Sequence, residues 1–485
     1  MPVFFFAKKW RNNMELSQSM PKARVQIAHP ALAILGLMIG SFVGMFSETA
    51  LNIALPSLMG SLGVTQGTVQ WLVTGYMLVI GICMPLSSLL TRRFTTKPIV
   101  LFALGAFMVG AIISAVGTVF PVVLIGRMIQ GIGTGLVLPL MFSVAMQIFP
   151  PYQLGTVMGM AALVIMFAPA IGPTLTGLVL AVSTWHTIFW MFVPVLAIAF
   201  VLTAIAMENI YPQTGQKIDW LSILESTVGF GGIVIGTSMA SDAGWLALPV
   251  LFALIVGIIG LVAYALRQLH TETPMLNLRV FNNRAFTTGT LLVMLDFGVI
   301  LAAMYLLPSY LQRTMGLPVA MTGLIMLPGG VVNAAVSAIA GRSYDRYGAK
   351  WLTRIGFIIA MVGVVLLLAT NAHSSLVQVI AGHVILMIGA PLAMSPAQTY
   401  ALNSLSGAES ADGSAILNTL QQIVGAVATA IATSMVAVGT AQQSGVAGQT
   451  LGSHFGFAFV LILALVAFGI SWAVQGKVVS RDEQL

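Results

Sequence analysis

The residues of this sequence with the most capacity for chemistry are charged side chains placed within long apolar stretches. Two acids, Glu48 and Asp296, and one base, Arg127, lie in such stretches. A charge at this depth is expensive and indicates a functional role by default. A carboxyl group removed from water holds a proton more readily, so it can take up and release protons near neutral pH. The pattern therefore predicts proton binding within an apolar interior.

Asp296 is the strongest candidate for a proton-coupling residue, and Glu48 is the second. Asp296 lies near the middle of the apolar segment 285–309, with no basic residue within one or two helical turns. A lone carboxyl group at this depth is either protonated at rest or in contact with a water-filled cavity. Both arrangements suit a carrier of protons or cations. A neutral acid hydrogen-bonded to another helix is the structural alternative.

The elements that position these residues follow from a very apolar composition. Of 485 residues, 58% are hydrophobic and 7% are charged, and the mean hydropathy is +0.99. A soluble domain carries about 25% charged residues, so a soluble enzyme, a disordered chain and a nucleic-acid-binding protein are excluded. The single cysteine, Cys83, allows no internal disulfide and no cysteine metal cluster. The sequence has no phosphate-binding loop, and we expect no catalytic residues, no cofactor and no metal.

Fourteen segments are long enough to cross a bilayer, which takes about 20 mainly apolar residues. They are residues 31–56, 69–90, 98–118, 121–146, 155–181, 187–207, 220–240, 246–267, 285–309, 321–341, 352–370, 375–400, 411–438 and 453–475. The segments are too long and too uniformly apolar for the alternating strands of an outer-membrane barrel. We therefore predict an all-α integral membrane protein with a bundle of 14 transmembrane helices.

The basic residues predict the orientation, because Lys and Arg in short loops stay on the cytoplasmic side. With both termini in the cytoplasm, 18 of the 20 basic residues fall in cytoplasmic loops or tails. Of the other two, Arg313 falls outside and Arg127 lies within a helix. The net charge of +7 is thus mainly a topology signal and not the mark of a nucleic-acid partner.

A weak internal repeat divides the chain. The triplet at 55–57 matches the triplet at 307–309 at an offset of 252, and the loop 88–97 matches the loop 341–350 at an offset of 253. Duplicated halves related by an axis along the membrane normal are typical of transporters. The expected parts are a cytoplasmic N-terminal tail (1–29), a six-helix half (30–208), two linker helices (209–284), a second six-helix half (285–476) and a cytoplasmic C-terminal tail (477–485). Translation from Met14 or Met20 is an open alternative for the first tail.

Four motifs link the chain to a known family. They are Glu48 to Pro56, Leu124 to Gly133, Gly159 to Gly177, and the loop Gly341 to Lys350. With the six, two, six arrangement they resemble the major facilitator superfamily. The fourteen-helix count resembles its drug:proton antiporter branch of multidrug and lincomycin-resistance-like exporters. The resemblance spans most of the chain and implies a central cavity that is exposed alternately to the two sides of the membrane.

The motif in segment 155–181 is similar to the superfamily's antiporter signature. Its members are Gly159, Ala168, Gly172, Pro173, Thr176 and Gly177, with Ala168 and Thr176 where glycine is usual. Small side chains let helices approach closely, and Pro173 removes a backbone hydrogen bond and bends the helix. The resemblance links this bend to exchange transport, in which it seals a leak path. Generic small-residue packing is the structural alternative.

Arg127, Gln130 and Gly131 belong to a sequence that is similar to the superfamily's buried-arginine motif. The structural alternative is an arginine that reaches the outer headgroups. Glu48 stands where the first-helix motif of the family usually has aspartate. Because the first and fourth helices are neighbours in the superfamily, the resemblance brings Glu48 near Arg127 and leaves open whether the two pair. A static ion pair or hydrogen bond that fixes the helices is the structural alternative to proton coupling by Glu48.

The loop from Gly341 to Lys350 is similar to the superfamily's gating loop. The family's acid caps a neighbouring helix and its basic residues form ion pairs at the inner face; the matching members here are Gly341, Arg342, Asp345, Arg346, Gly348 and Lys350. In the first-half copy, glycine, aspartate, glycine and arginine are replaced by Ser88, Arg92, Thr95 and Thr96. We therefore expect an inner gate without that carboxylate, or a plain topology-setting loop, in the first half.

Three further residues carry simpler expectations. Asp412 falls at the very start of the segment 411–438 and is expected to be a solvated loop residue. Trp71 and Tyr76, at the outer start of the second segment, are expected to anchor the helix at the membrane interface.

Together these patterns predict a proton-coupled antiporter, and not an enzyme, that exports lipophilic drug-like compounds across a bacterial-type cell membrane. The expected partners are protons, small lipophilic substrates and membrane lipid, and we expect the chain to function as a monomer. A major-facilitator carrier for one physiological solute (a metabolite, peptide or lipid) is the alternative. A polytopic membrane enzyme or a channel is less compatible, because the loops are short and have no cluster of polar catalytic residues.

Overall fold

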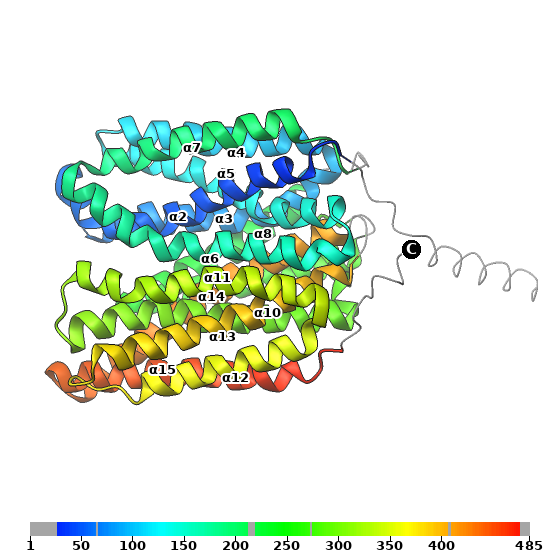
Figure 1. The fold of residues 1–485 in the computed structure, drawn as a ribbon. Coiled ribbons are helices and arrows are strands. Elements are labelled where there is room, and N and C mark those ends of the chain that lie inside the picture. The colour runs from blue at the N-terminus through cyan, green and yellow to red at the C-terminus, as the bar shows by residue number, and fades with distance from the viewer. Residues whose placement is uncertain (1–26, 65, 212–218, 272–273, 406–408, 476–485) are drawn as a thin grey trace, which may run out of the picture.

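A computed structural model describes residues 27–64, 66–211, 219–271, 274–405 and 409–475. Within this part of the chain, 14 helices are long and apolar enough to cross a membrane, which confirms the expected number. Most of the expected N-terminal tail and all of the expected C-terminal tail lie outside the described residues. The basic residue at 217, which was counted for the orientation, lies outside them as well. The described chain begins and ends at the same end of the bundle (Figure 1), which we call the inner end.

The helices follow one another with short connections. They are α2 (Pro30–Leu62), α3 (Gln66–Arg93), α4 (Thr96–Val116), α5 (Phe120–Ile148), α6 (Pro151–Val182), α7 (Trp185–Ala206), α8 (Trp220–Ala243), α9 (Leu248–His270), α10 (Arg284–Ser309), α11 (Val319–Tyr347), α12 (Ala349–Leu368), α13 (Leu376–Asn403), α14 (Glu409–Gln442) and α15 (Gly445–Ser471). A short 3-10 turn, η1 (Leu278–Asn282), precedes α10, and a π turn, η2 (Tyr310–Thr314), follows it.

Glycine ends the first crossing, whereas helix α10 ends at Ser309, the expected end of the ninth segment. Helix α2 runs past the expected end at residue 56 and stops at Gly63, whose φ of 63° is left-handed and whose N–H bonds to the carbonyl of Met59. After α10 the chain continues through η2 and reaches Gly316, which has a φ of 68°. Glycine adopts this conformation without steric cost, and it therefore terminates a helix where proline did not.

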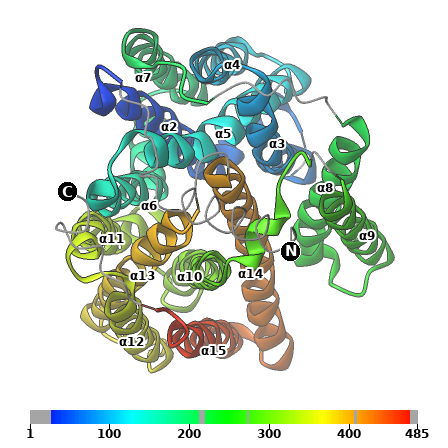
Figure 2. The same cartoon turned by 90° about the vertical axis from the view of Figure 1, so that its right-hand side faces the viewer.

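The helices pack as two groups with a pair at their flank. Viewed along the bundle, α2–α7 lie on one side, α10–α15 lie on the other, and α8 and α9 lie beside α3 and α14 (Figure 2). The two groups meet along two seams, one centred on α6 and α11 and one centred on α3 and α14. Helix α13 also contacts α6, and α5 also contacts α14. Helix α8 packs on both α3 and α14 and so flanks the second seam.

The α6/α11 seam is close because glycines face each other across it. A Cβ atom added at Gly159 would lie 2.7 Å from the carbonyl oxygen of Ser337 and 2.8 Å from the Cα of Gly341. A Cβ at Gly341 would overlap the carbonyl oxygen of Gly155. Only residues without a side chain allow the two backbones to come this near.

Candidate functional site

Arg127 is fully buried where three helices meet. It lies on α5, and its guanidinium donates from Nε to the carbonyl oxygen of Leu72 on α3 at 3.1 Å. Its Nη1 donates to Ser47 Oγ on α2 at 2.6 Å and to Gln130 Oε1 at 2.7 Å. The arginine therefore points into the protein and joins α2, α3 and α5, instead of reaching lipid headgroups.

Tyr76 completes the environment of this guanidinium. The arginine carbon Cζ lies 3.9 Å from the centre of the Tyr76 ring. The hydroxyl of Tyr76 donates to the carbonyl oxygen of Gly44 at 2.8 Å and shares a hydrogen bond of 2.7 Å with Thr134 Oγ1. Because a buried cation needs several partners, the aromatic face and three hydrogen bonds replace part of the lost hydration. The remaining nitrogen, Nη2, has no hydrogen-bond partner among the described residues.

The expectation that Tyr76 anchors α3 at the membrane interface is wrong, since its side chain is fully buried. A signal was available in the sequence, because Leu72 and Tyr76 are four residues apart and share one helix face. Gly131 explains the close approach of α3 and α5. A Cβ there would lie 2.9 Å from both the Tyr76 carbonyl oxygen and the Val79 Cβ.

Glu48 lies beside this network without a direct ion pair to the arginine. It follows Ser47 on α2 and is partly buried. Among the described residues, ion pairs join only Arg92 to Asp412 and Arg267 to Asp219. Glu48 is nevertheless near the arginine, because the preceding residue, Ser47, accepts a hydrogen bond from the guanidinium. The arrangement couples a carboxyl group electrostatically to a fixed cation.

Asp296 is fully buried on α10, and neither of its carboxyl oxygens has a hydrogen-bond partner among the described residues. An ionised carboxyl group without a partner is very costly in such a place. This environment differs from the structural alternative of an acid hydrogen-bonded to another helix. Release of the proton requires water or a cation to reach the carboxyl group.

The small residues of the α6 motif face different neighbours. Gly159 packs on α11, and Gly172 faces Thr49 on α2. Ala168 and Thr176 are buried. Gly177 has no atom within 4 Å of the place where its Cβ would lie, so it makes no close helix contact. Pro173 lies within the span of α6, but its side chain is outside the described part.

Asp345 holds the start of α6 from the opposite group of helices. Its Oδ1 accepts a hydrogen bond of 2.7 Å from the backbone N–H of Gly155. Its Oδ2 accepts from the N–H of Thr156 at 2.8 Å and from Thr156 Oγ1 at 2.7 Å. A carboxylate near a helix N-terminus is stabilised by aligned backbone dipoles. This contact closes the inner end of the α6/α11 seam.

The basic members of this loop do not form the expected ion pairs within the described part of the chain. Arg342 and Arg346 are exposed, and the Cζ of Arg346 lies 5.2 Å from the Tyr347 ring centre. Gly348 separates α11 from α12 with a φ of 72°, and Lys350 lies in the first turn of α12.

The first-half loop does meet an acid, which comes from the other group of helices. Asp412 lies in the first turn of α14 and is fully buried, so the expectation of a solvated loop residue is wrong. Its carboxylate accepts hydrogen bonds from Ser88 Oγ and from Arg92 Nη2, both on α3. Sequence position alone concealed this contact, because 320 residues separate Arg92 from Asp412.

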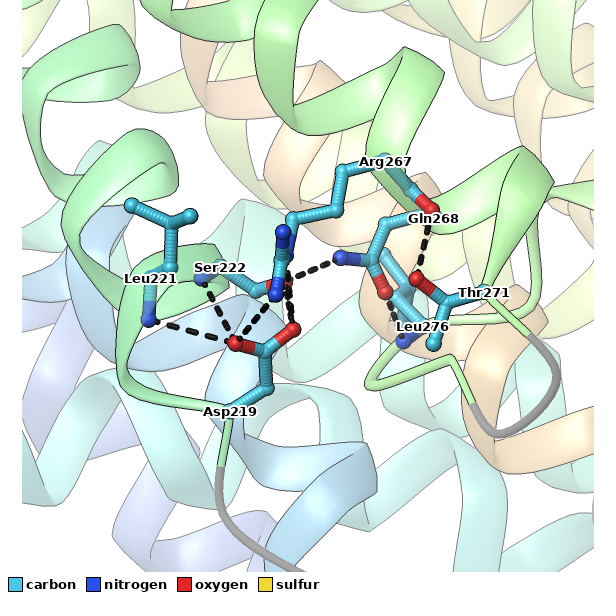
Figure 3. A network of polar contacts seen from close by, with 7 residues as sticks. All are labelled: Asp219, Leu221, Ser222, Arg267, Gln268, Thr271 and Leu276. Carbon is cyan, nitrogen blue, oxygen red and sulfur yellow. Dashed lines mark hydrogen bonds and ion pairs between the residues drawn. The ribbon is translucent and has the colours of Figure 1, made fainter.

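The flanking pair α8 and α9 is joined by its own polar network at the inner end (Figure 3). Asp219 caps α8 and accepts from Arg267 Nε at 2.8 Å and Nη2 at 3.0 Å. Ser222 Oγ donates to Asp219 at 2.7 Å and accepts from Gln268 Nε2 at 2.6 Å. The Arg267 hydrogen bonds are the main reason that the pKa of Asp219 is lowered to about 2.

Comparison with known proteins gives the family. Residues 37–429 match the Major Facilitator Superfamily. The chain is 44% identical over 446 residues to the lincomycin resistance protein LmrB of Bacillus subtilis (strain 168), covering 89% of this chain and 93% of that one. It is 43% identical over 451 residues to LmrB of Listeria monocytogenes serovar 1/2a, covering 91% and 96%. A multidrug resistance protein B homolog of Mycobacterium tuberculosis (strain ATCC 25618 / H37Rv) is 27% identical over 399 residues, covering 81% of this chain and 74% of that one.

Solved structures share the fold at low sequence identity. The human organic anion transporter MFSD10 superposes with a TM-score of 0.65 and 14% identity, covering 91% of this chain and 99% of that one. The proton:xylose symporter XylE superposes with a TM-score of 0.65 and 15% identity, covering 92% and 95%.

The family match, the 14 apolar helices and the bacterial relatives lead to one conclusion. The chain belongs to the major facilitator superfamily, as a multi-pass transporter of the cell membrane that is related to drug-resistance proteins.

Proposed function

We propose that the protein is a proton-coupled antiporter that exports lipophilic drug-like compounds by alternating access. The observation that carries this proposal is Asp296, a fully buried carboxyl group without a hydrogen-bond partner among the described residues. Such a group in a transporter is suited to exchange a proton for another ligand. The similarity to relatives named for lincomycin and multidrug resistance supports drug-like substrates.

The proposed cycle moves two six-helix halves, α2–α7 and α10–α15, around a central cavity. The hydrogen bonds that the described residues make between these groups lie toward the inner end, which supports an inner-closed state. In this state Asp296 and Glu48 take up protons from outside and release the substrate. The protonated carrier then returns, opens inward, loses its protons and binds the next substrate from the cytoplasm or the inner leaflet.

The driving force is adequate for such export. One charge moved through 100 mV supplies about 2.3 kcal/mol, which corresponds to roughly fifty-fold accumulation before any pH gradient is added. A pair of acids would allow a second proton in each cycle. In this proposal Arg127 keeps the α2 acid, Glu48, in a fixed electrostatic environment, and one chain is the functional unit.

The test combines export with proton movement. Inside-out vesicles that contain the protein are energised, and lincomycin or a lipophilic cationic dye is added while internal acidification is followed. We expect substrate-induced proton release from the vesicles by the wild type and by Asp219→Asn, a matched substitution in the α8/α9 network. Asp296→Asn is expected to abolish both proton release and uncoupler-sensitive export.

The outcomes separate the possibilities. Uncoupler-sensitive export that survives Asp296→Asn but not Glu48→Gln would move the coupling site to α2. If the protein reaches the membrane but neither drug nor dye causes proton movement or export, the drug-export proposal is refuted. A carrier for one physiological solute would then replace it.

A further inference from the structure

We propose that Arg92 and Asp412 form an inner latch on the α3/α14 seam, in which the acid missing from the first-half loop is supplied by α14. Each seam is then closed at its inner end by one carboxylate. In the α6/α11 seam the carboxylate comes from the loop side, whereas in the α3/α14 seam it comes from the receiving helix, α14. The latch holds the inner end closed until the seam separates.

The internal repeat identifies the corresponding positions on the loop side. At the offset of 253, Arg92 corresponds to Asp345 and Ser88 corresponds to Gly341. The second-half loop thus presents an acid to the neighbouring helix, whereas the first-half loop presents a base from the same position.

The receiving helices correspond by their first residues, since α6 begins at Pro151 and α14 begins at Glu409. The pair Gly155-Thr156 near the start of α6 matches the pair Gly413-Ser414 near the start of α14, at an offset of 258. In α6 this pair donates to Asp345 of the opposite group. In α14 the residue before the pair is Asp412, so this helix carries its own carboxylate.

The two arrangements satisfy the same electrostatic requirement. Each places one carboxylate near the N-terminus of α6 or α14, where the helix dipole favours negative charge. Because the carboxylate belongs to α14, the groups that bind it must come from α3 and must be a cation or a hydrogen-bond donor. Arg92 and Ser88 provide these groups.

The two seams differ in the side chains that meet across them. Between α6 and α11, glycines allow backbone contact, and the short arm of Asp345 reaches the N–H groups of α6. On α3 the position of Gly341 is occupied by Ser88, and the atoms nearest to a Cβ at Gly413 belong to Leu405, Phe286 and Leu402. At this seam the contact is made between side chains, because Ser88 Oγ and Arg92 Nη2 both donate to the Asp412 carboxylate.

Other contacts place the latch at the centre of the closed inner end. The turn η1, which leads from α9 to α10, also packs on α14. Gln147 Nε2 on α5 donates to Ser410 Oγ at 2.7 Å. Ser414 Oγ donates to the Pro139 carbonyl oxygen at 2.7 Å. Opening the inner end separates these contacts together with the latch.

The pair is asymmetric, and this asymmetry makes the latch testable. The side chain of Asp412 is 1% exposed and that of Arg92 is 17% exposed. Loss of Arg92 leaves a buried carboxylate that gains hydration only when the inner end opens, whereas loss of Asp412 leaves a cation that can reach the inner surface. When both charges are removed, no buried carboxylate remains that would gain hydration from an open inner end.

The experiment measures inner opening directly. In a Cys83→Ser background, Met146→Cys places a thiol at a buried position near the inner end of α5. Inside-out vesicles are treated with a membrane-impermeant maleimide, and the labelling rate is measured without substrate. The variants are Arg92→Ala, Asp412→Ala, the double alanine variant, and Arg93→Ala as the matched control on the same helix end.

We expect Arg92→Ala to accelerate labelling about tenfold, which corresponds to about 1.4 kcal/mol. Asp412→Ala is expected to have a smaller effect, and the double variant to label no faster than Asp412→Ala. Arg92→Lys and Arg93→Ala are expected to label like the wild type. The latch is refuted if the two alanine effects multiply in the double variant, if Arg93→Ala has an equal effect, or if no variant changes the rate.

The amount of protein in the membrane and its elution profile in detergent identify any variant that fails to fold. If one single alanine variant fails to fold, the labelling rates of Arg92→Lys and of the double variant still test the latch. Because labelling needs neither substrate nor proton gradient, the latch can fail while drug export stands, and the reverse also holds.

Discussion

Substitution of Asp345 by asparagine should open the inner end of the transporter. The carboxylate accepts three hydrogen bonds of 2.7, 2.8 and 2.7 Å from two residues of α6. Asparagine keeps one acceptor oxygen and places an NH₂ group against the remaining donors. Hydrogen bonds to charged groups contribute about 1.5–3 kcal/mol, and the partial exposure of Asp345 favours the lower end of that range.

This loss affects only the inner-closed state, because the two seams separate when the inner end opens. A change of about 1.5 to 2 kcal/mol shifts the ratio of inner-open to inner-closed protein by roughly ten- to thirty-fold. The expected consequence is a larger inner-open population and slower export, since the carrier returns less readily to the outward-facing state.

Spin labels can report this shift. Phe94, between α3 and α4, and Trp351, at the start of α12, are 47% and 60% exposed at the inner end and belong to opposite groups. With cysteines at both positions in the Cys83→Ser background, pulsed electron resonance gives the distance distribution between the groups. Asp345→Asn should increase the long-distance population, whereas Asp219→Asn, a helix-capping acid on the same side, should not.

An unchanged distance distribution in Asp345→Asn, with the protein folded and inserted, would refute the reasoning. An equal shift in Asp219→Asn would refute it as well, because the effect would then come from net charge at the inner surface and not from the α6 contact.

Three further substitutions have defined outcomes. Gly341→Ala brings a methyl group against the Gly155 backbone, and overpacking of about 1–3 kcal/mol should separate α6 from α11 and lower both export and thermal stability. Arg127→Lys keeps the charge but loses the Nε hydrogen bond to α3 and the planar contact with Tyr76, so thermal unfolding should show a loss of about 1.5–3 kcal/mol. Asp219→Ala removes the α8 cap and should cost about 1 kcal/mol. Because the pKa of Asp219 is lowered to about 2, its stabilisation is complete above the unfolded pKa of about 3.9 and is lost only as pH falls from about 4 to 2.

Each of these predictions has a control. Gly469→Ala, at a helical position with no atom within 4 Å, should leave export and stability close to the wild type. A stability of Arg127→Lys equal to the wild type would show that the charge alone suffices. For Asp219→Ala, thermal shifts measured at pH of about 7 and about 5 should agree, and a shift that disappears at the lower pH would contradict the lowered pKa.

The number of crossings and the buried positions of Arg127 and Asp296 followed from the sequence. Both depend on local composition, because any residue within 20 apolar residues is carried into the membrane interior whatever its neighbours are. The repeat was also visible in the sequence, since the corresponding loops keep the same spacing. The motifs that carry the family resemblance could also be recognised in the sequence, because they are defined by residue types at fixed spacings.

The partners of these residues were decided by tertiary packing. Asp412 stands beside polar residues in the sequence, yet it is buried because α3 of the other helix group covers it with Ser88 and Arg92. Tyr76 is a residue type that often anchors helices at the membrane interface, yet its ring stacks on the guanidinium of Arg127 from α5.

Gly159 and Gly177 belong to one motif, but only Gly159 meets another helix. The physical reason is the same in each case. Hydropathy and charge are properties of a segment and determine which residues enter the membrane, whereas contacts between residues hundreds of positions apart depend on which helices the fold places side by side.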